Sequence, residues 1–111
     1  MKLSSYKSGS ASVICPREAI TQAECDQIRL MVAEASVSGT STIILDLSEV
    51  PFVDSVGLEM MLDLDRGCRD RGGRLKLVGL SDNCTDILRL TDLTSRFEIL
   101  PTVEQALRGG I

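Results

Sequence analysis

The sequence predicts an α/β fold in which a small, mostly parallel β-sheet is covered by about four helices. Short apolar runs alternate along the chain with longer segments whose apolar residues recur at helical spacing. The run at 43–47 (IILDL) is too short for a helix and is rich in apolar side chains. Such a run is typical of a strand covered on both faces, as in parallel sheets. With 111 residues, we expect one domain, 1–111.

The composition excludes several functional classes. A formal net charge of −4 argues against nucleic-acid and anionic-membrane partners, which attract basic surfaces. No apolar segment is long enough to cross a bilayer, and the N-terminus lacks the apolar region of a signal peptide, so we expect a cytoplasmic protein without membrane insertion. There is no histidine. A Ser-His-Asp triad therefore cannot form, and we expect neither a metal nor a cofactor.

The N-terminal segment gives weak signals. Residues 1–10 are small and polar, and we expect fraying at their start. Residues 11–15 (ASVIC) predict a short strand, which Pro16 would end or confine to an edge of the sheet. The pattern therefore indicates an N-terminal strand or hairpin and leaves its pairing open.

Two helices flank the run at 43–47. Thr21 and Glu24 have the spacing of a capping box, and Gly39 is a plausible stop for the helix that follows. The second helix is expected from Val56 to about Arg71, with Gly72-Gly73 ending it. Their apolar stripes comprise Ile28, Met31, Val32 and Ala35 in the first helix, and Gly57, Leu58, Met61, Leu62, Leu64 and Cys68 in the second.

The C-terminal part continues the alternation. A strand at 75–80 would complete a right-handed βαβ unit with the run at 43–47. Ser81 can cap a third helix, and a last strand is expected at 97–100 (FEIL). Thr102 opens a final helix that Gly109-Gly110 would end. We expect Leu90, Leu93 and Phe97 in the core. The side chains expected along one face of the C-terminal helices are Cys84, Ile87, Leu88 and Thr91 in the third helix and Val103, Ala106 and Leu107 in the last.

The segment Asp54-Ser55-Val56-Gly57 marks a helix start and carries the most informative hydroxyl. One interpretation is that Ser55 only caps the helix, since serine is a good N-cap residue. The other is that Ser55 accepts a phosphate, because a helix N-terminus offers free N–H groups and partial positive charge. Phosphorylation adds about −1.5 to −2 charges. Beside Glu49, Asp54 and Glu59, that charge would expel a partner without unfolding the domain.

The same region resembles a known family. The run Asp46-Leu47-Ser48, Val50, Phe52, Asp54-Ser55, Gly57-Leu58 resembles the signature of STAS domains, especially bacterial anti-sigma-factor antagonists. Gly72-Gly73 with LKLVGL, and then DILRLTDLTSRFEILPTVEQAL, are similar to the second half of that family. The resemblance covers residues from about 41 to 108. It implies a STAS-like fold.

The resemblance also implies a function in signal transduction and transcription regulation. The unmodified domain would bind an anti-sigma factor that is also a serine/threonine kinase and so free the sigma factor. The kinase, using ATP, would phosphorylate Ser55, and the modified domain would release it until a phosphoserine phosphatase resets the site. In this family the domain is a substrate and a binding partner, not an enzyme. The partner-binding residues that follow are Asp54, Ser55, Val56, Gly57 and Glu59.

Two alternatives remain beside this one. The chain could be a constitutive STAS scaffold or accessory subunit of a lipid-transport ABC complex or of a stress-signalling assembly. It could also be a phospho-aspartate receiver that uses Asp46 and Asp54, although Lys2, Lys7 and Lys76 are the only lysines and none follows the third strand. The cluster Arg66, Arg69, Arg71 and Arg74 indicates a solvated helix end, and the four cysteines, Cys15, Cys25, Cys68 and Cys84, indicate buried thiols.

Overall fold

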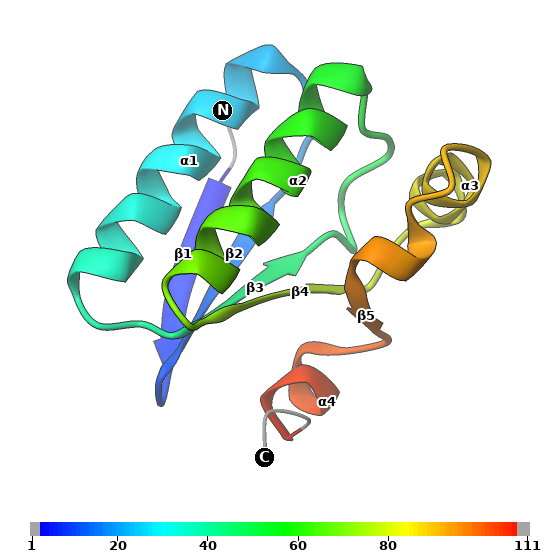
Figure 1. Ribbon diagram of the computed structural model, residues 1–111. Helices are drawn as coiled ribbons and strands as arrows, with labels where there is room; N and C mark the ends of the chain where they lie inside the picture. Colours follow the sequence, from blue (N-terminus) through cyan, green and yellow to red (C-terminus); the bar gives the residue numbers. More distant parts are fainter. Residues whose placement is uncertain (1–2, 109–111) are drawn as a thin grey trace.

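The computed structural model describes residues 3–108 and shows a five-stranded sheet with helices on both faces (Figure 1). The strand order is β1-β2-β3-β4-β5, with β1 antiparallel to β2 and every other pair parallel. The predicted α/β fold with a mostly parallel sheet is therefore confirmed. The elements are β1 (Leu3–Ser8), β2 (Ala11–Pro16), α1 (Gln22–Val37), β3 (Thr42–Asp46), α2 (Ser55–Asp70), β4 (Arg74–Val78), α3 (Asp82–Leu90), a 3-10 turn (Thr94–Arg96), β5 (Glu98–Leu100) and α4 (Val103–Arg108).

The helices divide the molecule into two apolar layers. Figure 1 shows α1 and α2 side by side across one face of the sheet. The main core lies beneath them and includes Ile14, Ile28, Leu45, Met61 and Leu77, and Cys84 and Leu88 of α3 belong to it too. On the opposite face, Ala106 of α4 packs in a smaller cluster with Ala11, Val13, Ile44 and Val78. The two layers explain why β3 and β4 are almost continuously apolar.

The N-terminal hairpin resolves the pairing that the sequence left open. Residues 3–8 form β1, which pairs antiparallel with β2 along its whole length. Gly9, at a φ of +63°, supplies the positive φ that a two-residue hairpin loop requires. β1 is an edge strand, and most of its side chains are exposed. It therefore lacks the apolar pattern by which a strand is recognised in a sequence. Pro16 ends β2, which lies inside the sheet and not at its edge.

The two long helices begin and end close to where the sequence places them. In α1, the capping box is confirmed, and Thr21 Oγ1 donates to Glu24 Oε1 at 2.6 Å. This hydrogen bond lowers the pKa of Glu24 below its ordinary value. Gly39, at a φ of +89°, follows the helix end. In α2, the buried side adds two residues that the expected stripe lacked, Met60 and Asp65.

The C-terminal elements differ from the expectation in two places. β4 ends at Val78, because Gly79 turns the chain with a φ of +66°. Leu90 was expected in the core, but it lies on the outer side of α3 with 84% of its surface exposed, while Leu88 and Phe97 are buried. The cap of α3 is confirmed, since Ser81 Oγ accepts from the N–H of Cys84 at 3.3 Å. Gly109-Gly110 lie outside the described residues.

The cysteines behave largely as expected. Cys25, Cys68 and Cys84 are buried, whereas Cys15 is partly exposed. Burial raises the pKa of Cys15, Cys25 and Cys68 above the ordinary thiol value, which lowers their thiolate fraction and their reactivity. Within residues 3–108, none of the helices has the length and apolar character that crossing a membrane requires.

Candidate phosphorylation and partner-binding site

The connection between β3 and α2, residues 47–54, is held on one side by hydrogen bonds with the end of β4 and the start of α3. Leu47 donates its N–H to Val78 O at 2.9 Å, at the end of β4. The hydroxyl of Ser81 donates to Val50 O at 3.1 Å, and the thiol of Cys84 reaches the same oxygen at 3.5 Å. One side of the loop is therefore attached to β4 and to the start of α3.

The other side of the loop is attached to the segment before α1. Ile20 donates its N–H to Phe52 O at 3.1 Å, and Asp54 donates its N–H to Ile20 O at 3.3 Å. Gly57 packs closely here, since a Cβ on it would lie 2.6 Å from both Ile20 O and Val53 Cγ1. The loop is thus held between two well-separated parts of the sequence, and the start of α2 has a fixed position.

Asp54, and not Ser55, is the N-cap of α2. Its carboxylate accepts the N–H of Gly57 at 2.8 Å. Ser55 is the first helical residue, and its side chain is exposed. The interpretation that Ser55 only caps the helix is therefore wrong. The hydroxyl of Ser55 stands at the positive end of a 16-residue helix, where a docking enzyme can reach it.

The cap gives a direct stability prediction. Asp54→Ala removes the acceptor of the Gly57 N–H and is expected to lower the free energy of unfolding by about 1 kcal/mol. Asp54→Asn keeps an acceptor oxygen and should change it by less than about half of that. Urea unfolding followed by circular dichroism measures both. Equal losses in the two variants would contradict the capping role.

The surface around Ser55 combines apolar and acidic side chains. Phe52 and Val56 are 46% and 38% exposed, and Glu59 is exposed as well. Asp54 is half-buried at the cap, and Gly57 is buried, so its side of the helix faces Ile20 and Val53. The exposure of Phe52 was not foreseen. Its neighbours Val50 and Val53 are buried, and no periodic pattern in the sequence distinguishes the exposed ring from these two side chains.

A shallow depression adjoins this surface at the carboxyl ends of the strands. Its volume is about 560 Å³. Arg17 and Glu49 form an ion pair across it at 3.7 Å, and because both side chains are more than half exposed, the pair contributes little to stability. The depression is lined by Arg17, Glu18, Ala19, Ser48, Glu49, Val50, Pro51 and Ser81.

Other candidate residues have local structural roles. Asp46 Oδ1 accepts the N–H of Ser48 at 3.1 Å, which stabilises the turn after β3. A phospho-aspartate receiver would require a lysine beside Asp46 and Asp54, but Lys76 is buried against α4. The arginine cluster is exposed, as expected, and it is largely paired: Arg66 with Asp63, Arg69 with Asp65 and Arg74 with Glu98.

The fold and the geometry of this site agree with the family to which the sequence is matched over nearly its whole length. The model of the STAS domain family matches residues 2–106. The chain belongs to the STAS domain family. Within that family it resembles the anti-sigma factor antagonist type. BtrV of Bordetella bronchiseptica, a proposed anti-sigma factor antagonist, is 24% identical over 106 residues, which are 96% of this chain and 91% of BtrV. The anti-sigma-B factor antagonist of Listeria monocytogenes is 35% identical over 66 residues, which are 60% of this chain and 57% of the relative.

Solved structures agree with this fold. A proposed anti-sigma factor antagonist of Thermotoga maritima is similar with a TM-score of 0.88 and 20% identity, over 96% of this chain and 92% of that one. The antagonist SpoIIAA in its unphosphorylated form has a TM-score of 0.81 and 23% identity, over 99% and 98% of the two chains. Bacillus SpoIIAA in its phosphorylated form has a TM-score of 0.76 and 20% identity, over 99% and 100%.

Proposed function

We propose that this STAS domain is an anti-sigma factor antagonist controlled by phosphorylation. In the cytoplasm, its unphosphorylated form binds an anti-sigma factor serine/threonine kinase and so frees the sigma factor. The kinase transfers the γ-phosphoryl group of ATP to the hydroxyl of Ser55, ADP leaves, and the modified domain dissociates. A phosphoserine phosphatase then restores the binding form. The domain acts as substrate and partner, without catalysis of its own.

The observation that carries the proposal is the exposed hydroxyl of Ser55 in the first turn of α2. A helix N-terminus tolerates a phosphate well, because its first N–H groups lack partners within the helix. The loop before it is held by hydrogen bonds to Ile20 on one side and from Ser81 on the other. The scaffold can therefore keep its conformation while the charge at its surface changes.

The neighbours of Ser55 explain why the charge would matter to a partner. Phe52 and Val56 offer apolar surface that a partner can cover, while Asp54 and Glu59 already make the site acidic. A phosphate adds about −1.5 to −2 charges to this group. Covering the apolar side chains would then also desolvate a cluster of like charges, which is unfavourable. Binding is lost at the interface while the core is unaffected.

The relatives support the same mechanism. SpoIIAA has been solved in a phosphorylated and an unphosphorylated form, and both share the fold of this chain. A fold common to both forms is what a switch confined to surface charge requires. BtrV and the Listeria relative are both described as antagonists of anti-sigma factors, which supports the class of partner in this proposal.

The test is a kinase reaction with the purified domain. An anti-sigma factor kinase encoded next to its gene, with ATP, is expected to add one phosphate, which peptide mass spectrometry should place on Ser55. Ser55→Ala should abolish the reaction, whereas Ser48→Ala, at another exposed serine of the same connection, should not. Phosphate on Ser48, or no phosphate from a kinase that binds the domain, would contradict the assignment. Binding that ATP leaves unchanged would favour the constitutive scaffold instead.

A further inference from the structure

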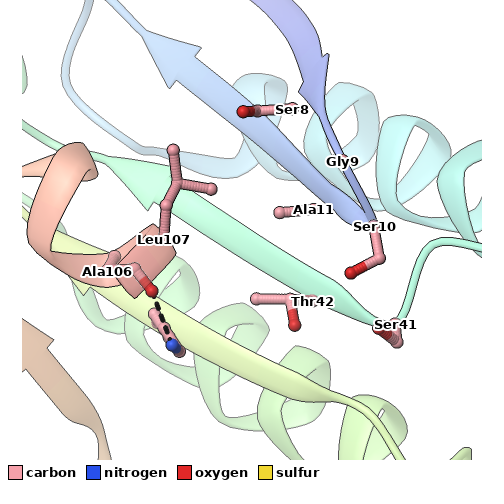
Figure 2. A pocket seen from close by; sticks show the side chains of 9 residues that line it. Ser8, Gly9, Ser10, Ala11, Ser41, Thr42, Ala106 and Leu107 are labelled. Atoms are coloured by element: carbon pink, nitrogen blue, oxygen red, sulfur yellow. Dashed lines mark hydrogen bonds between the residues drawn. The ribbon is translucent and has the colours of Figure 1, made fainter. Parts of the chain in front are cut away.

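Lys76 is a buried cation that the proposed function does not use. It lies in the middle of β4 on the face covered by α4, and its exposed fraction is 0%. Its Nζ donates a hydrogen bond to Ala106 O at 2.7 Å, the dashed line in Figure 2. The carbonyls at the C-terminal end of a helix attract a cation, which accounts for this one contact.

The charge of Lys76 is only partly compensated. The carboxylate of Glu98 lies 3.6 Å from Lys76 Nζ, and its other oxygen lies 3.5 Å from Arg74 Nη1. Two cations therefore share one carboxylate, and the group keeps a net positive charge. A buried charge that is incompletely paired is unfavourable, so an anion that approaches Lys76 would be attracted.

A cavity of about 410 Å³ adjoins Lys76 on this face of the sheet. Figure 2 shows Ser10 and Thr42 across the cavity from Ala106 and Leu107. Hydroxyl groups and small residues make up most of the wall, and within the described residues 3–108 no carboxylate lines it. The lining consists of Ser8, Gly9, Ser10, Ala11, Ser41, Thr42, Lys76, Ala106 and Leu107. Hydroxyl donors around a single cation are a suitable environment for an oxyanion.

We propose that this cavity binds a small phosphomonoester. The phosphate accepts hydrogen bonds from the hydroxyls of Ser10 and Thr42, and the ammonium of Lys76 turns from Ala106 O towards it on its flexible stem. The volume lies at the lower end of the range for small-molecule sites, about 300–1,000 Å³, so there is room for an organic group beside the phosphate. Leu107 and Ala11 supply apolar contacts for that group.

This site is separate from Ser55. Thr42 is the first residue of β3, whereas Ser55 follows the connection from the other end of the same strand. The two sites therefore lie at opposite ends of the sheet. The proposal of a phosphomonoester site can be tested independently of the proposed switch, because the cavity is not lined by residues around Ser55.

Amide chemical shifts in NMR spectra test the proposal, with inorganic phosphate and phenyl phosphate as the probes. Both should cause saturable shifts at Gly9, Ser10, Thr42 and Leu107, and phenyl phosphate should bind more tightly because its ring meets the apolar wall. Lys76→Met should weaken binding about tenfold or more, and Thr42→Val by about threefold to tenfold. Thr42→Val keeps the lysine and the shape of the strand, so it remains informative if Lys76→Met disturbs α4.

The controls use the opposite face of the sheet. Lys7→Met and Ser5→Ala change exposed side chains of β1 on the α1 side, outside the cavity, and should leave both affinities unchanged. The proposal is overturned if neither probe causes saturable shifts in the cavity at tens of millimolar. It is also overturned if the shifts occur only around Ser55, or if Thr42→Val binds both probes as well as the wild type.

Discussion

Ser55→Asp is expected to weaken binding of the anti-sigma factor kinase about a hundredfold, while Ser55→Ala should leave the affinity within about threefold. The carboxylate places a negative charge at the end of α2 beside Asp54, Phe52 and Val56, where a partner must displace water. A hundredfold loss corresponds to about 2.7 kcal/mol, which is within the range for leaving a charge desolvated at an interface. Isothermal titration calorimetry with the purified kinase measures both variants.

A matched control separates position from net charge. Ser5→Asp adds the same charge on the exposed edge strand β1, away from the loop, and should bind the kinase as the wild type does. Raising the salt concentration should not restore the Ser55→Asp complex fully, because a desolvation penalty is less sensitive to screening than long-range repulsion. Tight binding by Ser55→Asp, or an equal loss in Ser5→Asp, would argue against a switch at Ser55.

Gly73→Ala is expected to destabilise the fold by about 3 kcal/mol, because the added methyl group has no room. A Cβ on Gly73 would lie 2.1 Å from Ser41 O, a backbone atom that also accepts the N–H of Arg74 at 2.9 Å. Gly73 and Ser41 directly precede β4 and β3, so moving them apart would weaken the hydrogen bond from Arg74 at the start of this strand pair. Urea unfolding monitored by circular dichroism gives the change in unfolding free energy.

Gly67→Ala is the matched comparison, since it makes the same substitution inside α2. A Cβ there would meet only the flexible end of Arg71 at 3.4 Å, so alanine should stabilise the helix by about 0.5–1 kcal/mol. The two variants are expected to move the urea midpoint in opposite directions. If Gly73→Ala stays within about 1 kcal/mol of the wild type, the close approach between the strands does not hold in solution.

The parts of the fold that sequence predicts well are those with local causes. The capping box at Thr21 and the Ser81 cap have fixed spacing rules, and the glycines at 39 and 72 adopt a positive φ after helices. The run at 43–47 is apolar because both faces of β3 are covered. In each case the residues that identify the feature in the sequence are the residues that form it in the structure.

The misses have tertiary causes. β1 is held by pairing with β2 and not by its own side chains. The burial of Lys76, for which no expectation followed from the sequence, depends on α4, which supplies an acceptor for its ammonium thirty residues later in the chain. Leu90 is exposed because α3 presents only Cys84 and Leu88 to the core. None of these arrangements follows from a window of neighbouring residues.

The site shows the same division. The sequence pattern drew attention to both Asp54 and Ser55, and it could not decide which of them caps the helix, because aspartate and serine are equally good N-caps. The structure decides for Asp54 through its contact with the N–H of Gly57. Phe52 needed the structure too, since only the backbone pairing with Ile20 fixes which way the ring points.

The double attachment of the 47–54 connection separates fold maintenance from partner choice. Its anchoring contacts run mainly through backbone atoms, Ile20 with Phe52 and Asp54 on one side and Val50 on the other. Side chains such as Phe52, Val56 and Glu59 can consequently diverge with little penalty to the scaffold. Under the proposed function, duplicated domains in one cell could acquire different kinase partners through these few positions and so keep parallel regulatory circuits insulated from one another.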